Sequence, residues 1–254
     1  MNRYFISLAY NGKNYCGWQT QPNGPAVQQC LEGAMQTFFR RDVTVVGAGR
    51  TDAGVHAKLM VAHFDSLDPI DNLPLLADKL NRLLPHDIAV SKIVPVRADA
   101  HARFDALSRT YHYYVTTRKD AFNFPFALRL YKMPDFDAMN EACRVLYGHT
   151  DFTSFSKLHT DVKTNNCRIT YAAWEKDGDQ WRFVISADRF LRNMVRAIVG
   201  TLLDVGRHRL TTEDFASIIE ALDRGKAGAS APAHALFLAD IVYPGNVFEN
   251  LSPP

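Results

Sequence analysis

The segment VVGAGRTDAGVHA, from Val45 to Ala57, places the carboxylate of Asp52 among three glycines, directly after a β-branched run. Strand-like sequence precedes the motif at 42–46 and follows it at 59–64, so we expect Asp52 in a loop between two strands. Glycines of this kind serve a backbone that turns sharply or that a ligand approaches closely. On this segment alone, two interpretations stay open: a site carried on a rigid scaffold, or an aspartate that only caps a turn.

Two familiar glycine-loop motifs do not fit the segment. A dinucleotide-binding G-x-G-x-x-G motif that starts at Gly47 needs its third glycine where Asp52 stands. A phosphate-binding loop that starts at Gly49 needs lysine after Gly54, where the chain has valine. A nucleotide-handling enzyme is therefore the weakest of the hypotheses that we consider.

The composition is that of an ordinary globular chain, with 254 residues, 47% hydrophobic and 22% charged residues, and a formal net charge of +2. The length fits one large domain or two small ones. The charge is unevenly placed, because six arginines and two aspartates lie between Arg182 and Arg209. Since arginine favours bidentate contacts with phosphate or carboxylate groups, this region is either a solvated helix face or a surface that faces RNA.

Several classes of protein are disfavoured by what the sequence lacks. None of the four cysteines lies in a C-x-x-C pair, which indicates reduced thiols in a cytoplasmic protein and argues against a zinc ribbon. The nine histidines include no H-E-x-x-H motif, so we expect no metal. The N-terminus does not resemble a signal peptide, and no apolar run reaches the about 18 residues of a membrane span. We expect neither secretion nor a membrane partner.

Strand and helix patterns alternate along the chain, which indicates an α/β or α+β architecture. The first part is expected to form strands at 4–10, 42–46, 59–64 and 88–96, and helices at 25–40 and 72–84. The pattern then begins again, with strands at 111–117, 168–174, 181–186 and 236–243, and helices at 136–147, 190–205 and 212–222. The pair Asp177-Gly178 predicts a hairpin turn. We expect the polar segment 153–166 to be a mobile loop and 225–233 to be a connection of small residues.

This repetition predicts two similar lobes that face each other across a cleft. The N-terminal lobe, 1–105, carries the Asp52 loop, and the C-terminal lobe, 106–254, carries a tyrosine-rich strand and an arginine-rich helix.

Three further motifs combine aromatic, amide and basic residues. The first consists of HARF at 101–104 and RTYHYY at 109–114. It interleaves arginines with aromatic rings, as stacking on unpaired RNA bases and contact with phosphates require. Strand alternation puts Tyr111 and Tyr113 on one face. The second, FLRNMVRAIVG at 190–200, gives a helix in which Arg192 and Arg196 share a face and could hold a carboxylate ionised. The third, YNGKNYCGWQTQ at 10–21, suits contacts with RNA. Each motif equally fits a structural role: an amphipathic strand, a surface helix and an ordered loop.

Taken together, these motifs resemble the tRNA pseudouridine synthase A family. The resemblance extends from about Tyr4 to Tyr243, with the motifs in that family's order and approximate spacing. The matching motifs are GAGRTDAGVHA, HARFDALSRTYHYY, FLRNMVRAIVG with TLLDVG, YNGKNYCGWQTQ and APAHALFLADIVY. The G-R-T-D-x-G-V-H element is highly specific. With this resemblance, the interpretation of Asp52 as a mere cap loses most of its weight.

The resemblance implies a role for each matching residue. Asp52 falls on the essential catalytic aspartate, Arg196 on the arginine that pairs with it, and Tyr111 on the tyrosine that stacks on the target uracil. Substrate contacts are expected from Arg50, which helps to hold the flipped nucleotide, and further from Thr51, Arg103 and Arg109.

The family resemblance also implies an architecture and a reaction. Its fold is a two-lobed α/β structure with mainly antiparallel sheets flanked by helices and a basic cleft. The family acts as a homodimer, without metal or organic cofactor. It converts uridine to pseudouridine at positions 38, 39 and 40 in the anticodon stem-loop of tRNA. A target in a stem must be unstacked, and phosphate contacts that offset this cost make binding salt-dependent.

Two positions depart from the family pattern, and one alternative function stays open. His208 in VGRHR and Ala235 in APAHALFL stand where glycine is usual, so the local geometry differs if those glycines need positive φ. The sequence does not distinguish attack of Asp52 at uracil C6, attack at C1′ and proton abstraction through a glycal. The alternative function is a non-catalytic anticodon-arm binder or RNA chaperone on the same fold, which would not need Asp52.

Overall fold

The computed structural model describes residues 1–157 and 164–248, and the chain divides into two compact units. The first unit contains residues Met1–Leu107 together with the chain from Leu238 onward, and the second contains Ser108–Phe237. No helix among the residues described is both long enough and apolar enough to cross a membrane.

The first unit is built on an antiparallel sheet whose strand order is β4-β1-β3-β9. Strand β1 (Asn2–Tyr10) pairs with β3 (His56–Ser66) on one side and with β4 (Ile88–Val96) on the other. The short β2 (Val46–Gly47) pairs with β3, and β9 (Leu236–Val242) follows β3 in the order, its residues from Leu238 belonging to this unit. The Asp52 loop therefore joins β2 to β3, two paired strands.

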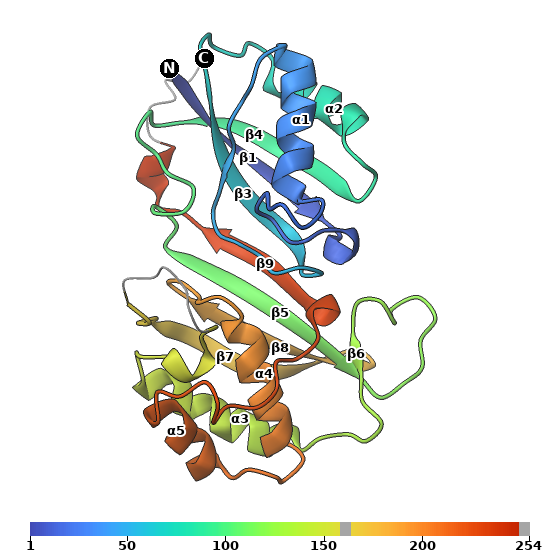
Figure 1. Cartoon of the computed structure of the whole chain (residues 1–254), viewed down its shortest axis with the longest axis vertical. Helices are drawn as coiled ribbons and strands as arrows, with labels where there is room; N and C mark the ends of the chain where they lie inside the picture. Colours follow the sequence, from blue (N-terminus) through green and yellow to red (C-terminus); the bar gives the residue numbers. More distant parts are fainter. Residues whose placement is uncertain (158–163, 249–254) are drawn as a thin grey trace. The chain divides into compact units, whose positions relative to one another are not determined.

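Two helices cover this sheet, α1 (Val27–Phe39) and α2 (Leu73–Leu83), which lie side by side in Figure 1. Helix α1 buries Val27, Leu31, Ala34 and Met35, which recur at helical spacing on one face. Helix α2 begins after Asn72, whose side chain accepts a hydrogen bond from the backbone N–H of Leu75, as an N-cap does.

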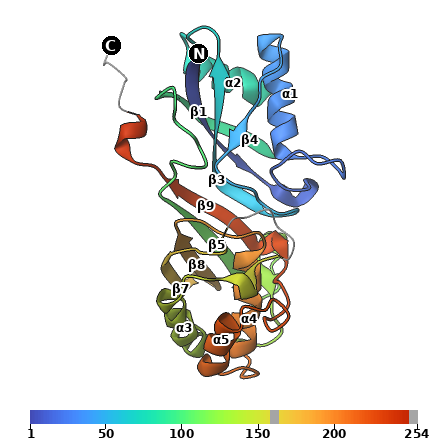
Figure 2. The ribbon, with the colours of Figure 1, turned by 60° about the vertical axis from the view of Figure 1, so that its left-hand side comes forward.

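The second unit has a sheet of order β5-β8-β7, with β6 (Leu128–Arg129) parallel to β5. Strand β5 (Ser108–Thr116) pairs with β8 (Gln180–Ala187), which forms a hairpin with β7 (Ile169–Asp177). Helices α3 (Phe136–Val145), α4 (Met194–Val205) and α5 (Thr212–Glu220) contact one another, and α3 packs on β7 (Figure 2). Ten of the twelve residues of α4 are buried, so α4 is the central helix of this unit.

Five short 3₁₀ segments lie among the described residues. They are η1 (Gly12–Asn14), η2 (Leu146–Gly148), η3 (Thr153–Phe155), η4 (Ala233–Ala235) and η5 (Gly245–Val247). Both units thus confirm the prediction of a mixed α and β fold with mainly antiparallel sheets flanked by helices. Part of the segment 153–166, which we expect to be mobile, lies outside the described residues.

The prediction of a strand at 42–46 is wrong apart from its last residue. Val43 and Val45 are buried, as in a strand, but the backbone of Val45 bonds to side chains of α1 instead of to another strand. Its N–H donates to Oε1 of Glu32 at 3.0 Å, and its carbonyl accepts from Nε2 of Gln28 at 2.9 Å. These side chains satisfy the backbone polar groups that a β-ladder would otherwise pair.

Two boundaries in the second unit also differ from the prediction. The hairpin turn consists of Gly178 and Asp179, because Asp177 still pairs with Gln180, and Gly178 takes the positive φ of 60° that such a turn requires. Helix α4 begins at Met194 and not at residue 190, because Asn193 adopts the left-handed conformation, with φ 67°. Its amide donates to the hydroxyl of Ser230 at 2.6 Å, which holds this break in place.

Candidate active site

The Asp52 loop lies directly against the segment that follows β1. Gly17 has φ 95°, and a Cβ atom at that position would stand 2.2 Å from the carbonyl oxygen of Thr51. Trp18 is buried, and its indole covers Gly47, where a Cβ atom would come within 2.5 Å of the ring. Both glycines are therefore required for the two segments to approach this closely.

Hydrogen bonds fix the loop at several points along its length. The backbone N–H of Trp18 donates to the carbonyl of Thr51 at 3.3 Å, and the N–H of Gly54 donates to that of Tyr15 at 3.2 Å. Within the loop, the N–H of Val55 donates to the carbonyl of Asp52 at 3.1 Å. Asp52 itself is half-buried, so its carboxylate is carried by a backbone with little freedom to move.

The two residues before Asp52 have different surroundings. Arg50 is exposed, as a side chain that contacts an RNA backbone must be. Thr51 is buried, and its hydroxyl shares a 2.8 Å hydrogen bond with the hydroxyl of Tyr10 at the end of β1. This bond ties the loop to the sheet, while the expected contact of Thr51 with substrate stays a prediction.

Arg103, the remaining residue of the first unit from which we expect a substrate contact, is exposed on a turn after β4. Its guanidinium carbon lies over the ring of Phe104, 5.7 Å from the centroid. The turn is thus separate in sequence from the Asp52 loop and presents a cation beside an aromatic ring.

In the second unit, strand β5 carries Arg109 and Tyr111. The guanidinium of Arg109 donates to the carbonyl of Asp188 at 2.7 Å, which links the start of β5 to the end of β8. Tyr111 is half-buried, and Phe190 meets its ring edge to face, with centroids 5.1 Å apart and planes at 88°. This contact fixes the orientation of the tyrosine ring.

Arg196 lies in the first turn of α4 and is held by the segment that crosses this helix. Its Nε donates to the carbonyl of Ala231 at 2.7 Å, and the N–H of Ala231 donates back to the carbonyl of Arg196 at 2.9 Å. The crossing requires Gly200, where a Cβ atom would stand 1.8 Å from the carbonyl oxygen of Ala229. The connection 225–233 is thus fastened to α4, and it directs the guanidinium.

Tyr113 lies on β5, two residues after Tyr111, and its ring is affected by the charge of Arg196 on α4. Its side chain is fully buried, and its hydroxyl has no hydrogen-bond partner in the described part of the chain. Burial raises the pKa of Tyr113, and the charge of Arg196 partly opposes that rise. The charge of Arg196 therefore reaches a buried ring of this unit.

The predicted pairing of Arg192 with Arg196 on one helical face is wrong. Arg192 precedes α4, and the left-handed Asn193 between them ends the helical spacing. Only Arg196 keeps its place on the helix.

The two departures from the family pattern have different outcomes. His208 adopts φ 55°, so the left-handed conformation is present without glycine. Ala235 is buried in η4 and has no positive φ.

From the sequence, the segment 10–21 has two interpretations, RNA contact or an ordered loop. Tyr15, Gly17 and Trp18 are buried, and they support the Asp52 loop. Their supporting role was missed, because it depends on contacts with residues 47–54, which are distant in the sequence. The only sequence signal was a glycine directly before Trp18. Within the described ranges, no three His, Cys, Asp or Glu side chains gather as metal ligands would.

The sequence model of the tRNA pseudouridine synthase family matches residues 6–105 and 142–244, so the chain belongs to that family. The resemblance in the motifs is confirmed.

Relatives with high identity carry a more specific name. A tRNA pseudouridine synthase A of Parabacteroides distasonis is 66% identical over 248 residues, covering 98% of each chain. One of Bacteroides thetaiotaomicron is 62% identical, covering 98% of this chain and 93% of its own. A more distant one, of Caldicellulosiruptor bescii, is 37% identical and covers 96% of this chain and all of its own.

Proposed function

We propose that this protein converts uridine to pseudouridine at positions 38, 39 and 40 in the anticodon stem-loop of tRNA. The observation that carries the proposal is the placement of Asp52, half-buried on a loop fixed by Gly17 and Gly47, in a chain of the tRNA pseudouridine synthase family. The names of its relatives, tRNA pseudouridine synthase A, support the same reaction.

The reaction is an isomerisation that one carboxylate can begin. The N1–C1′ glycosidic bond breaks, the uracil turns, C5 bonds to C1′, and the proton on C5 leaves while N1 gains one. Product and substrate have the same atoms, so the balance needs no oxidant or co-substrate. Attack of Asp52 at C6, attack at C1′ and proton abstraction through a glycal all use this carboxylate as nucleophile or base.

The remaining residues hold the RNA and the detached base. Tyr111 stacks on the uracil, which permits rotation of the ring better than a fixed set of hydrogen bonds would. Arg196 pairs with the Asp52 carboxylate, as the family resemblance implies. The RNA backbone is contacted by Arg50, Arg103 and Arg109, and Thr51 lies beside the flipped nucleotide. Because the arginines contact phosphates, binding of the tRNA should weaken as the salt concentration rises.

Release of the C5 proton gives a direct test. tRNA transcribed with uridine tritiated at C5 should release tritium to water with wild-type protein and no added cofactor. Asp52→Asn, which keeps the size of the side chain, should release none above background. Asp42→Asn, a change of an exposed aspartate bonded to Gln36, serves as the matched control and should retain wild-type release. Equal release by wild type and Asp52→Asn would contradict the proposed role.

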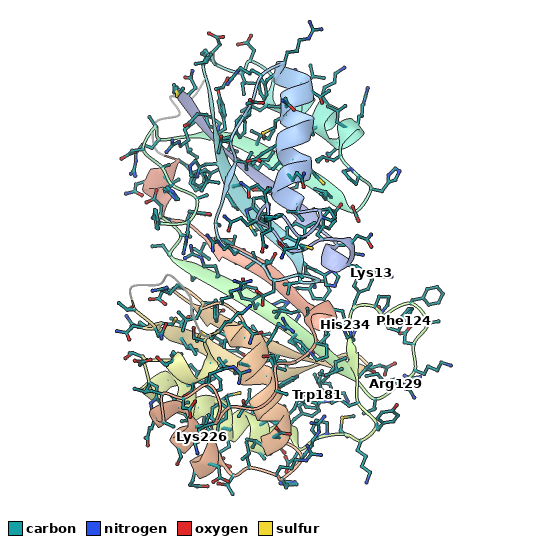
Figure 3. All side chains as sticks on the ribbon, viewed as in Figure 1. Lys13, Phe124, Arg129, Trp181, Lys226 and His234 are labelled. Atoms are coloured by element: carbon teal, nitrogen blue, oxygen red, sulfur yellow. The ribbon has the colours of Figure 1, made fainter. Side chains whose placement is uncertain are left out.

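We further propose that the protein acts in the cytoplasm as a homodimer. Four free cysteines support a reducing compartment. The segment 117–133 supports a partner surface, because it exposes several large apolar side chains. These are Phe122, Phe124, Tyr131 and Met133, which are 87%, 67%, 98% and 58% exposed. Figure 3 labels Phe124 and Arg129 on this segment. Sedimentation equilibrium should give twice the chain mass for wild type, and the mass of one chain for Phe122→Ser with Phe124→Ser. A monomeric wild type would contradict the dimer.

A further inference from the structure

Three rings form a ladder that leads from the core of the first unit to its surface. His63 is buried, and its ring centroid lies 4.6 Å from that of His101, which is half-buried. The ring of His101 lies 4.2 Å from that of Phe104, with planes at 34°. Phe104 ends the ladder with 74% of the residue exposed.

The turn that carries Phe104 is held by its backbone. Nδ1 of His63 accepts from the N–H of Ala102 at 3.1 Å, and Nδ1 of His101 accepts from the N–H groups of Arg103 and Phe104 at 3.1 and 3.3 Å. Asp105 closes the turn, because its carboxylate accepts from the N–H of His101 at 2.8 Å.

Bonds from other elements fasten the same turn to the sheet. The hydroxyl of Tyr243, just after β9, donates to the carbonyl of Ala102 at 2.5 Å. Arg3 on β1 donates to the carbonyl of Ala100 at 3.0 Å and binds the carboxylate of Asp65 on β3 at 2.8 Å. A turn with this many partners presents its outward side chains at little further cost in conformational entropy.

Burial does not explain the position of Phe104. Burying a phenylalanine side chain contributes about 1.5–3 kcal/mol, and most of that contribution is absent here. The ring instead stands beside the guanidinium of Arg103, whose carbon is 5.7 Å from the ring centroid. A fixed exposed ring next to a guanidinium offers a π face for a base and a fork for the phosphate attached to it.

We propose that Phe104 and Arg103 form a stacking platform for an unpaired base of the tRNA substrate, with the guanidinium on the adjoining phosphate. The inference rests on the proposed function, because it assumes that the RNA is the substrate. It adds a base contact that is separate from the stacking of the target uracil on Tyr111. An RNA strand offers both a base for the ring of Phe104 and a phosphate for the guanidinium of Arg103, whereas the apolar surface of a second protein chain would match only the ring.

Substitutions at position 104 separate stacking from simple apolar contact. Because stacking on an aromatic side chain is worth about 1–3 kcal/mol, Phe104→Ala should weaken tRNA binding roughly 5- to 150-fold. Phe104→Leu keeps apolar area without a π face and should lose nearly as much, while Phe104→Tyr should stay within about 2-fold of wild type. Phe38→Ala removes a ring that is 39% exposed on α1 and is the matched control, with wild-type binding expected.

The measurements are fluorescence anisotropy with labelled tRNA and thermal unfolding of each variant. Arg103→Gln should lower the slope of log binding constant against log salt by about one phosphate contact. Phe104→Trp adds a reporter, whose emission should be quenched by tRNA beyond the wild-type background; Trp18 and Trp174 are each 3% exposed and should change little.

The outcomes distinguish this platform from the proposed function. Wild-type affinity in Phe104→Ala or Phe104→Leu, at wild-type Tm and with active wild-type enzyme, overturns the platform alone. A change from dimer to monomer in Phe104→Ala would assign the ring to a protein contact and also overturn it. Absence of pseudouridine formation by wild type would overturn the proposed function itself, whatever the binding data show.

Discussion

Gly17→Ala should damage catalysis more than it damages folding, although Gly17 lies 35 positions before Asp52 in the sequence. The added Cβ atom would stand 2.2 Å from the carbonyl oxygen of Thr51 and 3.1 Å from the carbonyl carbon of Asp52. Ordinary contact begins at 3.4 Å, so the loop must move by about 1.2 Å, the difference between 3.4 and 2.2 Å. Both atoms that obstruct the Cβ belong to backbone and have no rotamer through which to escape.

The expected loss follows from this displacement. A misplacement of about 1 Å in a catalytic group can cost roughly 100-fold in rate, which corresponds to about 2.7 kcal/mol in the barrier. The positive φ of 95° adds a folding cost of about 1–2 kcal/mol for any residue other than glycine. We therefore expect kcat to fall about 100-fold at saturating tRNA, with a moderate fall in Tm.

Gly178→Ala is the control that separates strain from displacement. Gly178 has φ 60°, but nothing lies within 4 Å of a Cβ atom there, since it is in the β7–β8 turn. Its alanine variant should lose a similar folding energy of about 1–2 kcal/mol and keep wild-type kcat. The assay is single-turnover pseudouridine formation at a temperature where all three proteins are folded. Wild-type kcat in Gly17→Ala, or an equal fall in Gly178→Ala, would refute the reasoning.

Three stability predictions follow from individual side chains. His208→Gly should raise the free energy of unfolding, measured in urea, by about 1 kcal/mol. The substitution removes the backbone strain of a left-handed residue with φ 55° and loses only an exposed contact with Asp135. A lower free energy of unfolding would contradict that strain. Burial, with a smaller effect of the charge of Arg3, lowers the pKa of His63 to about 4. Between pH 6.5 and 4 the unfolded chain therefore binds a proton at His63 that the folded chain does not bind. Up to about 3 kcal/mol of the free energy of unfolding is lost as the pH falls through this range. His63→Gln should lack that part of the pH dependence, and parallel curves of unfolding free energy against pH would contradict it. Tyr113→Phe removes a buried hydroxyl without a partner and should leave stability equal or about 1 kcal/mol higher by thermal unfolding, whereas a loss of more than that would show a hidden bond.

The sequence predicted those parts of the fold that depend on local pattern. Strand β4 occupies the predicted range, Ile88–Val96, because alternation and flanking turn residues determine it. The place of Asp52 between two strands was predicted in the same way. The strand expected at 42–46 was mispredicted because β-branched burial there comes with side-chain partners from α1, which no local pattern reveals.

The motifs identified the family, but the support around the site depends on contacts distant in sequence. Gly17 and Trp18 act on residues 47–52, and Ala231 acts on Arg196, so neither role can be read from its own segment. The start of α4 was misplaced because Asn193 takes a conformation stabilised by Ser230, 37 residues later. Local residues thus predict which chemistry is present, while distant backbone contacts decide how rigidly it is held.

The most direct test of the central claim is to map the modified positions. Unmodified tRNA with uridines at 38, 39 and 40 is incubated with wild-type protein or Asp52→Asn, without cofactor, then treated with a carbodiimide and copied by primer extension. We predict stops at these uridines with wild type and none with Asp52→Asn. Salt-sensitive tRNA binding without stops in either protein, or equal stops in both, would contradict an isomerase that depends on Asp52.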